Sequence, residues 1–175
     1  MTKNTNQTLG QSRTFPEEPT DLEEPNDPNN KKKGVSHFYL NSDEEAEYMA
    51  YKPHRPELVS WANLKFKDNF AIKEYKDSLY RGLLDKGNKR TGKGVITYNS
   101  GRIFEGEWWD DKRHGLGFEI FHTGNSYEGE YVKGKVHGQG RYTWATGEFY
   151  DGEWVLGYKE GHGHWHGING DEYIG

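Results

Sequence analysis

Three histidines alternate in the stretch GHGHWHG near the C-terminus, at His162, His164 and His166. Successive side chains of a β-strand point to opposite faces, so all three would lie on one face, a spacing that can hold zinc or copper. His162, however, lies inside a recurring G-x-G pair, and the other two occupy an ordinary strand. A polar outer face is therefore the expected role, and we predict no metal site and no cofactor.

Glycine-rich stretches such as YEGEYVKGKVHGQG, residues 127–140, suggest a phosphate-binding loop at first sight. The chain contains no G-x-x-x-x-G-K-[ST] motif, and no G-x-G-x-x-G leads from a strand into a helix. No serine nucleophile stands beside a recurring base, and the carboxylates recur too regularly for an acid/base pair. They are expected to form a solvated face, at Glu105, Glu107, Glu128, Glu130, Asp151 and Glu153. We therefore predict a protein that is not an enzyme.

The composition points to a thin structure. Only 31% of the 175 residues are hydrophobic, whereas 15% are aromatic and 23 are glycine, so burial must come mainly from aromatic rings. The net charge of −5 does not favour nucleic acid, and the absence of cysteine excludes disulfides and cysteine-based zinc sites. No signal peptide or membrane span is recognisable, which predicts a cytoplasmic protein.

The C-terminal half is periodic. An aromatic residue that begins the pattern F/Y-x-G-E-W/Y recurs every 23 residues, at Phe104, Tyr127 and Tyr150, and Tyr173 falls one period later. An earlier copy begins at Tyr80 and is one residue longer. The repeats therefore span about 80–103, 104–126, 127–149 and 150–172, followed by a stub at 173–175. Each repeat is predicted to form two short strands and two turns.

The residues that recur at the same position of each repeat are predicted to have structural roles. Glycines reach turn conformations, and those inside strands leave room for a ring from an adjacent strand to lie on bare backbone. These glycines are Gly82, Gly106, Gly129, Gly152, Gly115, Gly117, Gly138, Gly140, Gly161 and Gly163. The rings are expected to line a groove that binds a partner, at Tyr80, Phe104, Trp108, Tyr127, Tyr131, Trp144, Tyr150 and Trp154.

The stretch YEGEYVKGKVHGQGRYTWATG resembles the MORN repeat, whose pattern is Y-x-G-x-W, a G-K turn, H-G-x-G and a final D-G-type turn. The resemblance covers about residues 80–175 and departs from the pattern in the first copy, at Asp111 and at Glu160. It implies a mostly β fold, an elongated single-layer antiparallel sheet of successive hairpins. The stretch Ala71–Tyr75 parallels a repeat strand, so the sheet is expected to span 70–175.

The N-terminal part is expected to behave differently. Residues 1–36 are rich in Asn, Pro, Glu and Lys and are predicted to be a disordered tail. Residues 37–69 are predicted to be a strap across the sheet, with a short helix from Ser42 to about Tyr51. A single-layer sheet exposes both faces, so either this strap or a partner is expected to cover the aromatic side.

Two functions remain open. The first is a structural adaptor that binds protein segments in its groove, because small MORN proteins resemble subunits of cytoskeletal assemblies such as the radial spoke of the ciliary axoneme. The bare C-terminal strand could also pair with a neighbour or a second copy. The second is a peripheral module that binds phosphoinositides or membrane through a basic edge, at Lys89, Arg90, Lys112, Arg113, Lys133, Lys135 and Lys159.

Overall fold

The computed structural model describes residues 51–175. The tail predicted at 1–36 lies outside the described residues, and so does the helix predicted from Ser42, apart from its last residue. Tyr51 itself is not helical. The described part is mostly β, as the repeat pattern predicts.

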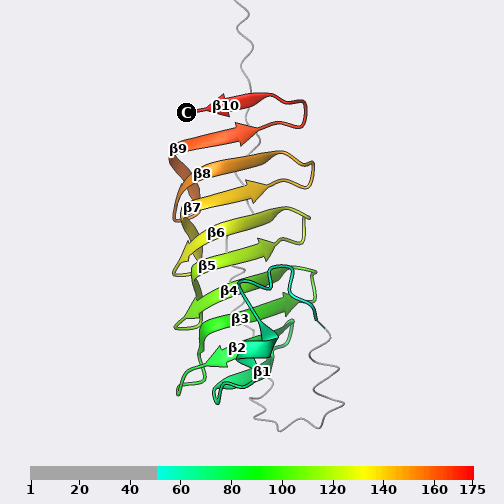
Figure 1. Cartoon of the computed structure of the whole chain (residues 1–175), viewed down its shortest axis with the longest axis vertical. Helices are drawn as coiled ribbons and strands as arrows, with labels where there is room; N and C mark the ends of the chain where they lie inside the picture. Colours follow the sequence, from blue (N-terminus) through cyan, green and yellow to red (C-terminus); the bar gives the residue numbers. More distant parts are fainter. Residues whose placement is uncertain (1–50) are drawn as a thin grey trace, which may run out of the picture.

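One antiparallel sheet in a single layer contains every strand of residues 51–175 (Figure 1). Its ten strands follow one another in chain order, and each pairs only with its sequence neighbours. The strands are β1 (Phe70–Glu74), β2 (Ser78–Leu84), β3 (Arg90–Tyr98), β4 (Ile103–Trp109), β5 (Lys112–Ile120), β6 (Ser126–Val132), β7 (Lys135–Thr143), β8 (Phe149–Val155), β9 (Tyr158–His166) and β10 (Glu172–Ile174). The elongated single-layer sheet of hairpins is thus confirmed, including the strand before the first repeat.

A row of glycines crosses the sheet from strand to strand. Gly82 pairs with Gly94, Gly106 with Gly117, Gly129 with Gly140 and Gly152 with Gly163. The aromatic residue that begins each repeat lies over one such pair: a Cβ atom built on Gly140 would stand 2.2 Å from the Tyr127 hydroxyl oxygen. Each ring therefore lies over a glycine of its own strand as well as one of the next strand. The sequence analysis expected each strand glycine to be covered only by a ring from an adjacent strand.

The rings form a zigzag on this face, which we call the ring face, defined by Tyr80, Phe104, Tyr127 and Tyr150. Neighbouring rings meet edge to face, with centroids 5.1–5.6 Å apart, in the order Tyr80, Trp108, Phe104, Tyr131, Tyr127, Trp154 and Tyr150. This arrangement suits the quadrupoles of aromatic rings. The main hydrophobic core of the described chain lies along this zigzag.

Tight turns and bulges shape each repeat. The β4–β5 turn has positive φ at Asp110 and at Asp111, the residue that replaces the glycine of the other copies, and Asp tolerates this conformation. In the β2–β3, β4–β5, β6–β7 and β8–β9 hairpins, a register shift follows the strand glycine, beside a positive-φ glycine such as Gly115. Glu107 accepts a hydrogen bond from the Leu116 amide at 2.9 Å, so it caps the bulge.

Residues 51–69 contain the short helix α2 (Trp61–Leu64) and lie across the N-terminal part of the sheet (Figure 1). They pack on the face opposite to the ring face, where Val59 and Leu64 form a second core with Val95. We call residues 51–69 the described strap, and the face that carries Val95, Glu105, Glu128 and Asp151 the strap face. The sequence interpretation offered the strap as one cover for the aromatic side, but this part of it covers the other side.

Candidate partner-binding surfaces

The rings predicted to line a groove form the core of the molecule. Tyr80, Phe104, Tyr127 and Tyr131 are at most 1% exposed, and Trp108 and Trp154 are 3% and 1% exposed. The indole N–H groups of the two tryptophans donate to the carbonyls of Gly94 and Gly140. Trp144 and Tyr150 are partly buried against the same core. A binding role for these rings stays a prediction, and a partner would reach only what the chain leaves exposed.

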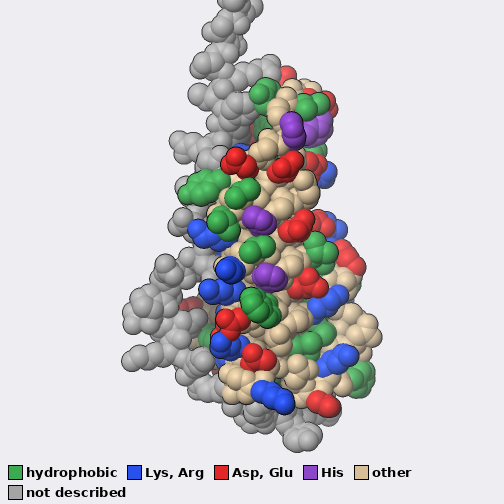
Figure 2. Space-filling view, turned by 90° about the vertical axis from the view of Figure 1, so that its left-hand side faces the viewer, with side chains coloured by type: hydrophobic (Ala, Val, Ile, Leu, Met, Phe, Trp, Pro, Cys, Tyr) green, Lys and Arg blue, Asp and Glu red, His purple; other side chains and the backbone are tan. Residues whose placement is uncertain are grey.

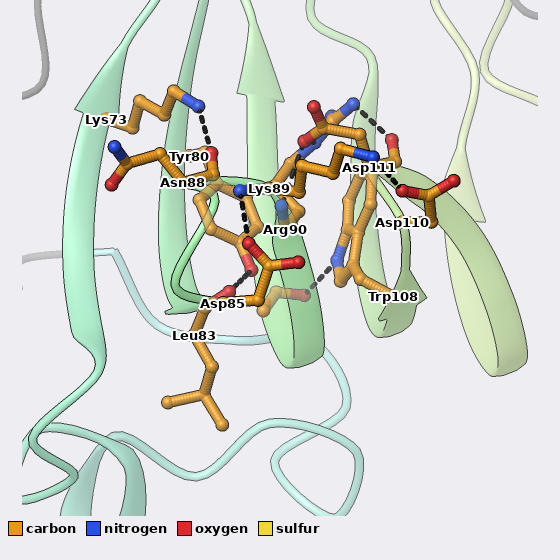
Figure 3. Close-up of polar contacts among 11 residues, drawn as sticks. Lys73, Tyr80, Leu83, Asp85, Asn88, Lys89, Arg90, Trp108, Asp110 and Asp111 are labelled. Carbon is orange, nitrogen blue, oxygen red and sulfur yellow. Dashed lines mark hydrogen bonds and ion pairs between the residues drawn. The ribbon is translucent and has the colours of Figure 1, made fainter.

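The predicted basic edge is partly neutralised by acidic neighbours from the next hairpin (Figure 3). Lys89 forms an ion pair with Asp110, and Arg90 forms one with Asp111 at 3.1 Å while its guanidinium lies 4.2 Å from the Trp108 ring centroid. Burial acts to raise the pKa of Asp111, but the hydrogen bonds and charge of Arg90 outweigh it, so the pKa is lowered. These two cations tie successive repeats together.

Arg113 is buried and belongs to an ionic cluster on the ring face. Its guanidinium donates to both carboxylate oxygens of Glu119, at 2.6 and 2.5 Å, and Arg102 donates to the same carboxylate at 2.6 Å. The Tyr131 hydroxyl also donates to Glu119, at 2.8 Å, and burial followed by the Glu119 charge raises the Tyr131 pKa. Arg113 therefore serves the core and is not presented to a partner.

Besides Lys89, three lysines of the predicted edge are exposed, at Lys112, Lys133 and Lys135, whereas Lys159 lies over the rings of Trp144 and Tyr150. Figure 2 looks onto this edge and shows basic, acidic and hydrophobic side chains interspersed along it. Exposed hydrophobic residues include Trp109, Leu116 and Tyr158. The edge is thus mixed in character, not a continuous basic strip.

The strap face carries a polar anchor that sequence reasoning missed. Glu105 is fully buried and accepts hydrogen bonds from the amides of His54 and Arg55, at 2.9 and 2.8 Å, and from the Tyr51 hydroxyl at 2.5 Å. Burial, followed by the contact with Glu105, raises the pKa of the Tyr51 hydroxyl. The sequence placed Glu105 on a solvated face, and this expectation is wrong because the strap encloses it.

The anchor shows how this face holds an extended segment. Tyr51 and His54 lie at Glu105, whereas Arg55 reaches over the Phe118 ring, with 5.4 Å between guanidinium and centroid, and forms an ion pair with Glu128. Backbone amides meet a carboxylate, and a cation meets both an aromatic face and the next carboxylate. These contacts are charge-assisted, which makes them stronger than neutral hydrogen bonds.

Equivalent positions follow at each period of the sheet. Glu105 is paired with Phe118, Glu128 with Arg141 and Asp151 with His164, so a carboxylate recurs in the same row of three successive repeats. Within residues 51–69, the contact furthest along this row is that of Arg55 with Glu128. Beyond it lies a shallow open groove of about 720 Å³, lined by Glu128, Arg141, Asp151, Glu153, His164 and Ile174 among others.

Charge in this groove is predominantly acidic. Its lining includes the carboxylates of Glu128, Asp151 and Glu153 and one guanidinium, that of Arg141. Arg141 donates to both oxygens of Asp151, at 2.8 and 2.6 Å, and the hydrogen bond with Asp151 raises its pKa. We call this groove over repeats three and four the acidic groove.

The C-terminal edge of the sheet is formed by β10, all three residues of which are exposed. Tyr173 and Ile174 are 50% and 75% exposed, so the last strand offers apolar side chains, and among the strands of residues 51–175 it forms the edge of the sheet. Pairing of this edge with a neighbour or a second copy stays a prediction.

Two signals could have revealed the Glu105 anchor. The stretch Tyr51-Lys-Pro-His-Arg55 combines an aromatic residue with two cations, which suits a carboxylate-bearing face. Glu105 is also the first of the recurring carboxylates, at the end of the sheet nearest the strap. Neither signal identifies the contact by itself, because Arg55 and Glu105 are 50 residues apart in the sequence.

Comparison with known proteins supports the repeat assignment. The MORN repeat profile matches four consecutive segments, residues 86–101, 104–126, 127–149 and 150–172. A search of curated proteins finds no match. MORN repeats suggest a module that binds protein or membrane, and proteins built from them are typically non-enzymatic. With its periodic sequence, its single sheet of hairpins and these four matches, the chain belongs to the MORN-repeat family.

Proposed function

We propose that this protein is a non-catalytic adaptor that holds an extended, basic segment of a partner protein in the acidic groove. The single observation that carries the proposal is the described strap, which binds the same face one repeat earlier. There, Glu105 accepts two backbone amides, and Arg55 bridges Phe118 and Glu128. The strap therefore acts as an internal example of the ligand.

Charge complementarity defines the chemistry of the partner. Three carboxylates and one guanidinium line the groove, so a segment with arginine or lysine side chains would gain favourable contacts. The carboxylate of Asp151 lies in the same row as Glu105, two repeats later, and would accept backbone amides beside the two hydrogen bonds that Arg141 donates to it. The side chains of the partner segment are expected to alternate regularly, because the segment would lie across strands that are spaced about 4.8 Å apart.

The cellular setting belongs to the same proposal. We propose that the adaptor belongs to a cytoplasmic, cytoskeletal assembly, such as the axoneme of a cilium or flagellum. Small MORN proteins resemble subunits of the radial spoke, which is part of the axoneme. This part rests on the family resemblance. Imaging of the tagged chain in ciliated cells tests it directly: signal along the axoneme would support it, and a diffuse or membrane signal would oppose it.

Photo-crosslinking tests the groove itself. A photoreactive amino acid at Gln139, an exposed residue of the groove lining, should crosslink to an extended basic segment of another protein in cell extract. The same amino acid at His122, exposed in the β5–β6 turn, is the matched control. Equal yields at both positions, or crosslinks only to acidic segments, would contradict the proposal.

A membrane-binding role is the second candidate, supported by exposed lysines beside exposed apolar residues on the β4–β5 and β6–β7 edge. Within residues 51–175, no helix has the length and apolar character needed to cross a bilayer. Flotation with phosphoinositide vesicles tests this role. Salt-sensitive binding that is lost in Lys133→Glu/Lys135→Glu would favour it.

A further inference from the structure

Two histidines and a glutamate converge at the C-terminal end of the strap face. His164 and His166 lie two residues apart on β9, and Glu172 lies on β10 directly opposite His166. One ligand atom from each of the three side chains lies within 4.8 Å of the other two. The group differs from the sequence triplet, because Glu172 takes the place expected for His162.

The distances fit a tetrahedral metal ion. Glu172 oxygens lie 3.5 Å from His164 Nε2 and 3.4 Å from His166 Nδ1. Two ligands that are each about 2.0–2.1 Å from a tetrahedral ion are about 3.3 Å apart. The two distances to Glu172 are close to this value, and all three ligand atoms lie within 4.8 Å of one another.

The surroundings hold the ligands in place. The Phe149 ring stacks on His166 with centroids 4.2 Å apart and planes at 23°, which fixes the orientation of this imidazole. The Gly167 amide donates to the Asp171 carbonyl at 2.8 Å and so closes the β9–β10 turn in this register. His164 Nε2 is enclosed, and no other described residue offers it a hydrogen bond. A buried nitrogen without such a partner is costly unless it binds something.

The two imidazoles lie close together, with ring centroids 3.9 Å apart. Imidazole nitrogens are ligands that suit a borderline cation such as zinc. Nitrogen and carboxylate ligands in a group of three are typical of zinc sites that keep a fourth position for water.

We propose that His164, His166 and Glu172 bind one zinc ion, which links β9 to the terminal strand β10. All residues of β10 are exposed, and its backbone pairs only with β9 among the described strands. Zinc would therefore fix the edge that a partner or a second copy could meet. His164 also lines the acidic groove, so the zinc site adjoins the surface proposed for the partner segment, but its test uses zinc alone and does not need that segment.

The test uses the full chain, purified without a polyhistidine tag, and zinc chloride as the only added ligand. Isothermal titration should give one zinc per chain, and thermal unfolding should shift upward at equimolar zinc. His164→Ala and Glu172→Gln should each weaken binding about tenfold or more, whereas His162→Ala, on the same strand, should leave it unchanged. Cobalt substitution should give the intense visible bands of a four-coordinate site.

Three results would each contradict the site. The first is no binding at equimolar zinc, and the second is a weak cobalt spectrum typical of a six-coordinate ion. The third is that His162→Ala weakens zinc binding as much as Glu172→Gln does. Sedimentation separates a site within one chain from one shared between chains: one zinc per two chains with a dimer also rejects the proposal. Glu172→Gln changes an exposed residue, so a native circular dichroism spectrum of this variant excludes loss of folding as the cause.

Discussion

Gly140→Ala tests the packing of aromatic rings on bare backbone. Gly140 does not belong to the positive-φ glycines, so alanine is conformationally allowed there. Its Cβ atom would stand 2.2 Å from the hydroxyl oxygen and 2.4 Å from Cζ of Tyr127. Because Tyr127 is fully buried, the ring has to move against Tyr131 and Trp154.

The expected cost follows from three contributions. Overpacking of a close-packed core costs about 1–3 kcal/mol. Displacement of the ring also breaks the hydrogen bond from the Tyr127 hydroxyl to the Glu130 carbonyl, about 1 kcal/mol. The reduced entropy of the unfolded chain returns about 0.5 kcal/mol. We therefore expect Gly140→Ala to lower the free energy of unfolding by about 1.5–3.5 kcal/mol.

Urea denaturation followed by tryptophan fluorescence measures this change. Gly87→Ala is the matched control, because its only close contact is the Asp85 carboxylate oxygen at 3.3 Å, and its effect should stay within about 0.5 kcal/mol. Tyr127→Phe removes the nearest atom, so it should recover part of the loss in the double variant. If Gly140→Ala is no more destabilising than Gly87→Ala, the ring does not rest on this glycine and the reasoning fails.

The remaining predictions concern the strap and the effect of pH. Glu105→Gln should destabilise strap docking by about 1–3 kcal/mol, because a buried charged acceptor is lost, and hydrogen exchange at the His54 and Arg55 amides should accelerate, whereas Glu148→Gln should leave it unchanged. The lowered pKa of Asp111 contributes stability that is present above about pH 4 and is lost as pH falls through the folded-state pKa. Urea titrations should therefore show a difference between the wild type and Asp111→Asn that shrinks on acidification, and a difference independent of pH would contradict this. Burial raises the pKa of Tyr75 to about 12, so its contribution to stability is present below about pH 10 and is lost as pH rises toward 12. Unfolding midpoints above about pH 10 should fall together with the appearance of tyrosinate absorbance, and constant midpoints would argue against a buried phenol.

The sheet could be predicted because its physical cause is periodic. Aromatic residues such as Tyr127 need glycines beneath them, and hairpin turns need residues that tolerate positive φ, so both requirements repeat every 23 residues. The strand before the first repeat was also predictable from Ala71–Tyr75, and it forms β1 (Phe70–Glu74). Local requirements of this kind are visible in one sequence.

The strap and the metal-ligand group were harder to predict. Burial of Glu105 depends on Tyr51 and Arg55, which lie about 50 residues earlier, and the sequence contains several similar carboxylates. The face that the strap covers depends on this pairing. The contact of Glu172 with His166 follows from the repeat register at Tyr173, so it was readable in principle. The sequence interpretation considered only residues of one strand.

Selection of peptides on the intact chain tests the central functional claim most directly. A displayed library of random peptides should yield extended binders rich in arginine and lysine. Their affinity should fall about tenfold or more in Glu128→Lys/Asp151→Lys and stay unchanged in Glu148→Lys, which lies outside the residues that line the acidic groove. Binders that are not basic, or that bind the double variant as tightly as the wild type, would contradict the proposal that the acidic groove receives a partner segment as the strap face receives Arg55.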